Sequence, residues 1–143
     1  MPEGIQKITA CAFLHQDGKV FIAKRADTKK FLPGKYELPG GHIEFGETLE
    51  DGLKREFQEE FGVEITIGEP FFAFTYTNTE KQSHSVEIIY FATLKNETQK
   101  IKLNPADHSE YKWLGESEMN ILPPEDHETE AIRKGFKLLA VTL

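Results

Sequence analysis

The sequence lacks the features that define several classes of protein. Cys11 is the single cysteine in 143 residues, so a fold cross-linked by disulfides within the chain is excluded. No apolar run approaches the roughly 20 residues that cross a bilayer. The first residues, "MPEGIQKI", lack a basic segment followed by an apolar one, so we expect no signal peptide. These absences favour a protein of the cytoplasm that has no membrane partner.

Basic charge is scarce as well. The chain has 17 Lys and Arg residues against 24 Asp and Glu residues, and the basic residues are scattered. Proteins that bind duplex nucleic acid usually carry a basic face, so we expect no such partner for a chain whose net charge is −7. A small phosphorylated ligand is compatible with this charge if metal ions offset the repulsion. The length favours one domain that spans residues 1–143.

Turn signals divide the chain into strands and helices. Apolar and β-branched runs predict strands at residues 8–15, 20–25, 36–38, 69–78, 84–94 and 110–114. Glycine- and proline-rich segments predict loops at residues 28–35 and 39–47. Residues 123–141 predict an amphipathic last helix, in which Gly135 is a weak point. The order strands, helix, strands, helix favours an α/β or α+β fold.

The first helix carries three acids at its end, in the stretch "LKREFQEEFGV". Thr48 is its predicted N-cap and Gly62 its left-handed C-terminal residue. Acids in the last turn face the negative end of the helix dipole and cost a few tenths of a kcal/mol each. Glu56, Glu59 and Glu60 share one side of the helix at i, i+3, i+4 spacing. A helical wheel places Glu60 within the apolar stripe.

Two interpretations of these acids are open at this point. A solvated acidic face, with an i,i+4 ion pair between Arg55 and Glu59, is the usual meaning of a charge run. It does not explain Glu60, because a buried carboxylate without a partner is expensive. A divalent cation would explain the whole set, since hard cations such as Mg²⁺ bind carboxylate oxygens.

The segment before the helix favours the cation. From Gly41, the sequence "GHIEFGETLEDGLKREFQEEFGV" has a glycine, five residues, Glu47, seven residues and then "REFQEEFGV". This resembles the Nudix box, the signature of the MutT-like Nudix hydrolase family, at every fixed position. "ELPGG" before the box and "EYKWL" after it are also similar to the family, so the resemblance covers effectively the full length. It implies a Nudix-type α/β/α sandwich with a mixed central sheet.

The resemblance also implies an activity and a set of site residues. Nudix hydrolases cleave the pyrophosphate linkage of a nucleoside diphosphate joined to a group X, with the help of Mg²⁺ or Mn²⁺. The resemblance implies metal ligands at Glu56, Glu59, Glu60 and the backbone carbonyl of Gly40. It implies a catalytic base at Glu59 or Glu56, or at a later carboxylate, with Glu110 the first candidate and Glu87 the second.

Other residues are given supporting roles by the resemblance. Glu47 and Arg55 are expected to form a pair that orients the loop and the helix, and Gly41 and Gly62 to be structural. Phosphate or base contacts are expected at Arg25, His42 and Asp126. Each has a plainer alternative: an exposed strand end for Arg25, a surface position for His42 and a cap of the last helix for Asp126.

The substrate is less well defined than the reaction. Asn78 and Thr79 stand where a proline or tyrosine would mark the ADP-ribose and diadenosine polyphosphate subfamilies, and the coenzyme A signature is absent. This favours a nucleoside triphosphate, cleaved to the monophosphate and pyrophosphate. The alternatives are a nucleotide sugar or other substrate of this class, a Nudix sensor that does not cleave, and a partner-binding domain. Aromatic residues that could stack on a base are Phe72, Phe74, Tyr76 and Phe91. A homodimer is compatible with the sequence.

Overall fold

The computed structural model describes residues 3–141. Its strands are β1 (Ile5–Gln16), β2 (Lys19–Arg25), β3 (Tyr36–Glu37), β4 (Gly40–His42), β5 (Ile65–Asn78), β6 (Ser83–Leu94) and β7 (His108–Gly115). Its α-helices are α1 (Leu49–Phe61) and α2 (His127–Val141), and a 3₁₀ helix spans Glu116–Ile121. Neither α-helix in the described part is long and apolar enough to cross a membrane.

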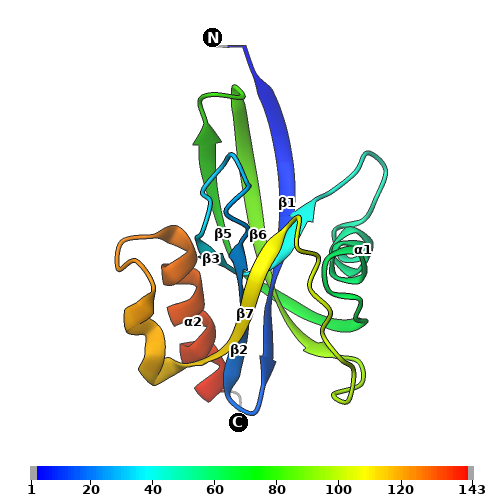
Figure 1. Cartoon of the computed structure of the whole chain (residues 1–143), viewed down its shortest axis with the longest axis vertical. Coiled ribbons are helices and arrows are strands. Elements are labelled where there is room, and N and C mark those ends of the chain that lie inside the picture. Colours follow the sequence, from blue (N-terminus) through cyan, green and yellow to red (C-terminus); the bar gives the residue numbers. More distant parts are fainter. Residues whose placement is uncertain (1–2, 142–143) are drawn as a thin grey trace.

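The strands form a mixed sheet with a helix on either side. The strand order is β3-β2-β1-β6-β5, with β4 also paired to β1 and β7 to β2. The β1–β6 pair is parallel, whereas the other pairs are antiparallel. Figure 1 shows α1 on one side of the sheet and α2 on the other. The predicted α/β/α sandwich with a mixed sheet is therefore confirmed.

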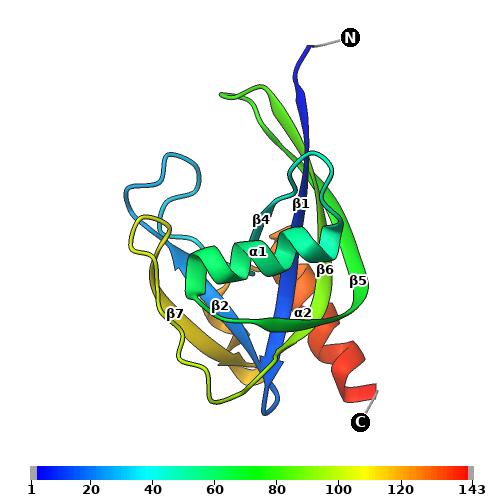
Figure 2. The same ribbon diagram turned by 90° about the vertical axis from the view of Figure 1, so that its right-hand side faces the viewer.

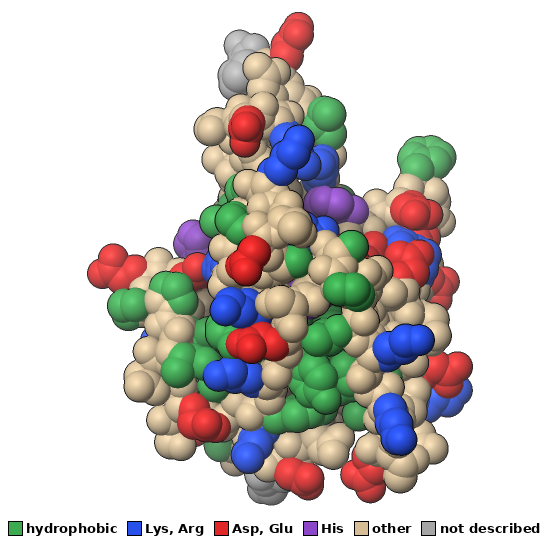
Figure 3. Space-filling model, viewed as in Figure 1, with side chains coloured by type: hydrophobic (Ala, Val, Ile, Leu, Met, Phe, Trp, Pro, Cys, Tyr) green, Lys and Arg blue, Asp and Glu red, His purple; other side chains and the backbone are tan. Residues whose placement is uncertain are grey.

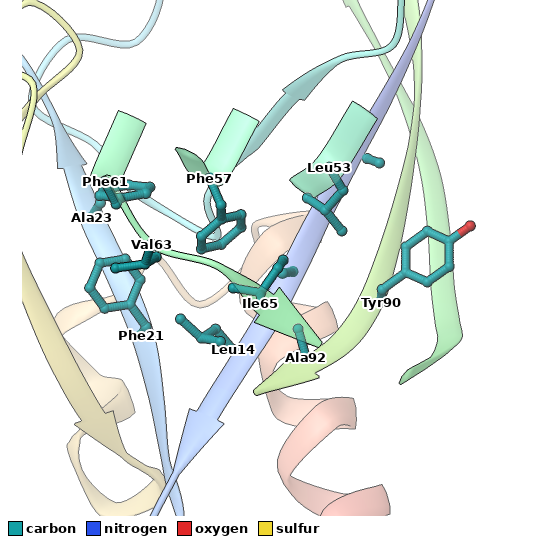
Figure 4. Close-up of a cluster of buried hydrophobic side chains, with 12 residues drawn as sticks. Leu14, Phe21, Ala23, Leu53, Phe57, Phe61, Val63, Ile65, Tyr90 and Ala92 are labelled. Atoms are coloured by element: carbon teal, nitrogen blue, oxygen red, sulfur yellow. The ribbon is translucent and has the colours of Figure 1, made fainter. Parts of the chain in front are cut away.

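Alternation along β1 supplies both halves of the core. Ala10, Ala12 and Leu14 belong to the cluster under α1, whereas Cys11 and Phe13 belong to the cluster under α2. Figure 4 shows the apolar side chains of α1 directed toward the strands. Each large side chain buried in this way stabilises the fold by about 1.5–3 kcal/mol. Burial of this helical face fixes the rotation of α1 and hence the direction of its glutamates.

Strand β4 corrects the prediction of an uninterrupted loop over residues 39–47. The hairpin strands β1 and β2 pair only at their shared turn, through His15↔Val20 and Gln16↔Lys19, and then diverge. The edge of β1 that β2 leaves free is taken by β4, in which Gly40 pairs with Cys11. A Cβ atom at Gly40 would lie 2.0 Å from the carbonyl oxygen of Ala10, so only glycine permits this approach. The local sequence predicted a loop because the edge of β1 with which β4 pairs exists only in the tertiary fold.

Gly135 has a packing role in α2 that the sequence did not predict. A Cβ atom there would lie 2.5 Å from the ring of the fully buried Phe13. Glycine therefore lets α2 approach the sheet closely, and its low helix propensity is offset by packing.

Replacing Gly135 by Ala should destabilise the protein although alanine is the better helix former. The added methyl group overpacks the contact with Phe13, which costs about 1–3 kcal/mol. The higher helix propensity of alanine stabilises α2 by only about 1 kcal/mol. Urea unfolding measures the difference, with the exposed Lys137→Ala on the same helix as the control. A variant more stable than the parent would show that α2 shifts freely on the sheet.

Candidate active site

The glutamates are positioned by the two ends of α1. The Thr48 hydroxyl accepts a hydrogen bond from the Asp51 N–H at 3.1 Å, and Gly62 ends the helix in the left-handed conformation with φ 66°. Both ends lie where the sequence predicts them. Behind the helix, a Cβ atom at Gly41 would lie 2.3 Å from the carboxyl carbon of Glu56. Glycine in β4 therefore makes the space in which the Glu56 carboxylate lies.

Arg55 organises the carboxylates on the outer side of the helix. Its guanidinium donates to both oxygens of Glu47, at 2.7 and 3.0 Å, and to the His42 carbonyl oxygen at 3.0 Å. It also donates to Glu56 at 3.0 Å and to Glu59 at 3.2 Å. The hydrogen bonds from Arg55 to Glu47 hold the pKa of Glu47 at about 2, well below its usual value. The expected pair between Glu47 and Arg55 is present, and it ties the loop before the helix to the glutamates.

Glu60 has the least favourable surroundings of the three acids. Its Oε2 atom is buried, with no hydrogen-bond partner among the described residues. The pKa of Glu60 is raised to about 9, chiefly by burial and in addition by the nearby charges of Glu56, Glu37 and Asp107, against the opposing charge of Lys29. Desolvation also raises the pKa of the half-buried Glu56. The solvated-face interpretation therefore does not hold for Glu60.

These carboxylates suit a hard divalent cation, because they offer only oxygen ligands and one of those oxygens lacks a partner. Within residues 3–141, no three Asp, Glu, His or Cys side chains are already gathered around one point closely enough to hold a metal ion. Glu56 and Glu59 are engaged with Arg55 instead. Arg55 contacts one oxygen of each carboxylate, which leaves the other oxygen of each for a cation.

The structure does not bring Glu110 to this group. Glu110 lies opposite Lys24 in the β2–β7 pair, is exposed, and accepts a hydrogen bond from the Tyr36 hydroxyl. Two acids that sequence reasoning missed, Glu37 and Asp107, lie near Glu60 instead. Strand β3 is only two residues long, and Asp107 is in a loop, so neither acid has a periodicity that reveals its direction.

Glu37 is held between two basic groups. Its Oε2 atom is hydrogen-bonded to Nε2 of the buried His108 at 2.8 Å, and its Oε1 atom is 3.4 Å from Nη1 of Arg25. The His108 ring stacks on Phe61 of α1, with ring centroids 5.2 Å apart. The end of α1 is thus connected through His108 and Glu37 to Arg25.

A cleft of about 460 Å³ opens next to these residues. It lies between the loop of residues 26–35 and the β5–β6 hairpin, which rise on either side of β4 in Figure 2. All three predicted substrate-binding residues are in its lining: Arg25, His42 and Asp126. The lining also includes other basic, acidic and aromatic side chains, among them Lys7, Lys35, Lys81, Glu37, Glu87, Glu128, Phe31, Phe74 and Tyr76.

Aromatic rings form two stacked pairs in the lining of this cleft. Phe31 and Tyr76 are nearly parallel, with centroids 6.2 Å apart, and Phe74 stacks on His127 at 5.2 Å. Of the four aromatic residues suggested for base stacking, Phe74 and Tyr76 line the cleft. The other two, Phe72 and Phe91, are not in the lining of the cleft. They lie on the same face of the sheet as Phe74 and pack with it against the core under α2, but farther from the β5–β6 turn.

Arg25 and Asp126 are each fixed by protein contacts. Arg25 donates from Nε to the Phe31 carbonyl oxygen at 2.9 Å, which joins the strand end to the loop. Asp126 accepts a hydrogen bond from the Glu128 N–H at 2.8 Å and pairs with Lys35 at 2.7 Å. Asp126 therefore caps α2 and lines the cleft at the same time. On the face shown in Figure 3, acidic and basic side chains are interspersed, without one large basic surface.

Residues 5–135 match the NUDIX domain family. The nucleoside triphosphatase NudI of Escherichia coli O139:H28 (strain E24377A / ETEC) is 27% identical over 118 residues, in an alignment that covers 76% of this chain and 82% of that protein. The structure resembles the MutT protein of Methanosarcina mazei Go1, with a TM-score of 0.81, 20% identity and coverage of 98% and 99% of the two chains. It also resembles a MutT NUDIX hydrolase of Burkholderia pseudomallei, with a TM-score of 0.70, 22% identity and coverage of 90% and 96%. The two structural likenesses concern the fold alone.

Replacing Glu60 by Gln should stabilise the protein in the absence of metal. The pKa of Glu60 is about 9 in the folded protein against 4.5 ordinarily, so folding takes up a proton between these values. The free energy of unfolding therefore decreases as pH rises through this window. Glu60→Gln should flatten the slope and raise the free energy of unfolding at pH 8 by about 1–3 kcal/mol.

Urea unfolding in chelator from pH 5 to pH 9 checks this, with Glu59→Gln as the exposed control on the same helix. A less stable Glu60→Gln at pH 8 would show that Glu60 makes a stabilising ion pair.

Proposed function

Because the chain belongs to the Nudix family and is therefore a pyrophosphohydrolase, we propose that its substrate is a nucleoside triphosphate. Hydrolysis between the α and β phosphorus atoms would release a nucleoside monophosphate and pyrophosphate. The relationship to NudI supports a triphosphate, since that protein is named a nucleoside triphosphatase. The observation that carries the proposal is the junction of cleft and acidic helix: Glu37 lines the cleft and its charge also raises the pKa of Glu60.

The cleft divides into regions that suit the parts of a nucleotide. The aromatic rings of Phe31, Phe74 and Tyr76 in the lining suit a flat base, because aromatic rings favour stacked or edge-on contacts with one another. Arg25 and Lys35 also line the cleft and offer positive charge for phosphate oxygens. The polyphosphate would then extend from the cleft toward α1.

The residues proposed to hold Mg²⁺ or Mn²⁺ are Glu56, Glu59, Glu60 and the Gly40 carbonyl. When bound, the cation supplies positive charge between the carboxylates and the phosphates and polarises phosphoryl oxygens. Arg55 orients Glu56 and Glu59 for this task through its hydrogen bonds. Glu59 is the most exposed of the three acids and is proposed to accept a proton from the attacking water.

A nucleotide sugar is the second candidate substrate, because the walls of the cleft do not by themselves select triphosphates. A panel of nucleoside triphosphates and nucleotide sugars, incubated with Mg²⁺ and analysed for products, decides between them. The proposal predicts monophosphate and pyrophosphate from at least one triphosphate. Release of monophosphate and a sugar phosphate, with triphosphates untouched, would reassign the substrate. No turnover of either class with intact ligand binding would favour a sensor.

Removing metal should abolish turnover, and so should removing its ligands. Activity is expected to need millimolar Mg²⁺ or Mn²⁺ and to vanish in chelator. Glu59→Gln and Glu60→Gln should each lower kcat by on the order of 10²-fold or more, because each weakens the negative charge that holds the cation. Steady-state pyrophosphate release measures this, and full activity in chelator would contradict it.

Arg25→Ala should raise KM for the triphosphate and also lower kcat, because a phosphate contact that strengthens as charge shifts contributes to both. The matched control is Lys24→Ala. Lys24 lies over the Tyr36 ring at 6.0 Å and is not in the lining of the cleft, so its loss should change either constant less than about twofold. Equal effects of the two substitutions would mean that Arg25 has no special contact with phosphate.

A further inference from the structure

Glu87 is a buried acid that the proposed metal site does not use. It lies on β6, is 6% exposed and lines the cleft. Its neighbour Ile88 packs against the core under α1, whereas Ile89, two residues on, belongs to the core under α2. Glu87 therefore faces the α2 side of the sheet. Its Oε2 atom is buried, and no described residue hydrogen-bonds to it.

Several elements place charged or titratable groups around Glu87. The pKa of Glu87 is raised to about 8, chiefly by burial, then by the charge of Glu37 on β3 and less by that of Asp126 before α2. The Cys11 thiol on β1 and Lys35 in the loop oppose this shift. Desolvation raises the pKa of Tyr76 on β5 and that of Glu128 on α2, and the charge of Glu87 is the second-largest cause of both shifts.

Glu128 is the informative comparison, because it is another acid in the lining of the cleft and its side chain is only 12% exposed. Its Oε1 atom accepts the Leu38 N–H at 2.8 Å, and its Oε2 atom is 3.5 Å from Nζ of Lys35. Both oxygens of Glu128 therefore have partners that favour its ionised form. Burial raises the pKa of Glu128 well above its usual value, as it raises that of Glu87, but of the two acids Glu87 is the one with a buried oxygen that no donor among the described residues contacts. That oxygen favours the protonated form of Glu87.

We propose that Glu87 recognises the base of the bound nucleotide as a neutral carboxyl group. This proposal rests on the proposed function, since it assigns a ligand to the same cleft. A neutral carboxyl group offers one O–H donor beside one acceptor oxygen, which complements a base edge with an acceptor beside a donor. Cytosine, adenine and uracil present such an edge. The rings of Phe74 and Tyr76, which also line the cleft, would stack on the base and hold it against this contact.

An unliganded carboxyl oxygen at the floor of the cleft has a cost that a ligand can remove. A buried polar group without a partner loses about 1–3 kcal/mol of hydrogen-bond stabilisation. A ribose phosphate that lacks a base would leave the group unpaired. Glu87 should therefore contribute to the difference in affinity between a nucleotide and ribose 5-phosphate, and not to phosphate binding itself.

Binding in chelator isolates this contact from catalysis. The probes are CMP, AMP, UMP and ribose 5-phosphate, titrated into isotope-labelled protein and followed by NMR, which also reports whether each variant is folded. At pH 7 the parent should bind at least one of the nucleotides about tenfold or more tightly than ribose 5-phosphate. Glu87→Gln keeps a donor beside an acceptor and should retain the preference. Glu87→Leu should lose it without weakening ribose 5-phosphate.

The pH dependence tests the protonated form directly. The preference of the parent for the base should decline as pH rises through about 8, whereas that of Glu87→Gln should stay constant. A preference that survives in a folded Glu87→Leu, or an equal loss for ribose 5-phosphate, would overturn the proposal. If triphosphates are hydrolysed but Glu87→Leu keeps the preference, this inference fails alone. If the base contact is found but no triphosphate is cleaved, the proposed function fails alone.

Discussion

The site depends on one constraint: the fold holds several carboxylates close together in partly desolvated surroundings, where they repel one another. Glu56, Glu37 and Asp107 all act on Glu60, from α1, β3 and a loop. The helix itself cannot relieve this repulsion, because the apolar residues of the same face fix its rotation under the sheet. The protein offsets part of the charge with Arg55 on one side and Lys29 and Arg25 on the other. A bound cation would offset the remaining negative charge and so allow a polyphosphate to approach.

Glycine and divergent strands give this arrangement its shape. Because β1 and β2 separate after their turn, β4 can pair with β1, and its glycines let the backbone lie close to β1 and to the Glu56 carboxylate. The same separation places the cleft next to the end of α1. Glu128 then joins α2 to this region through the N–H of Leu38, just before the glycine pair. The cleft and the acidic helix are therefore parts of one connected structure.

Much of the fold could be predicted because its signals are local. Thr48 and Gly62 define α1 through cap chemistry, and the alternation of apolar residues defines the long strands. The pairing of Glu47 with Arg55 was expected from the motif. By contrast, β4 depends on an edge that exists only after β1 and β2 diverge, and the value of Gly135 depends on the ring of Phe13 from a distant strand. Glu37 and Asp107 were missed for the same reason, since their approach to Glu60 is set by tertiary contacts.

Proton release on metal binding tests most directly whether the acids at the end of α1 hold a divalent cation. At pH 8 the carboxyl group of Glu60 is largely protonated without metal, since its pKa is about 9, and a cation that binds to it must displace that proton. Calorimetric titration of Mn²⁺ in buffers of different ionisation enthalpy should show release of about one proton per cation, and Glu60→Gln should abolish that release. Binding of Mn²⁺ by the parent without proton release, or with the same release and affinity in Glu60→Gln, would contradict the account.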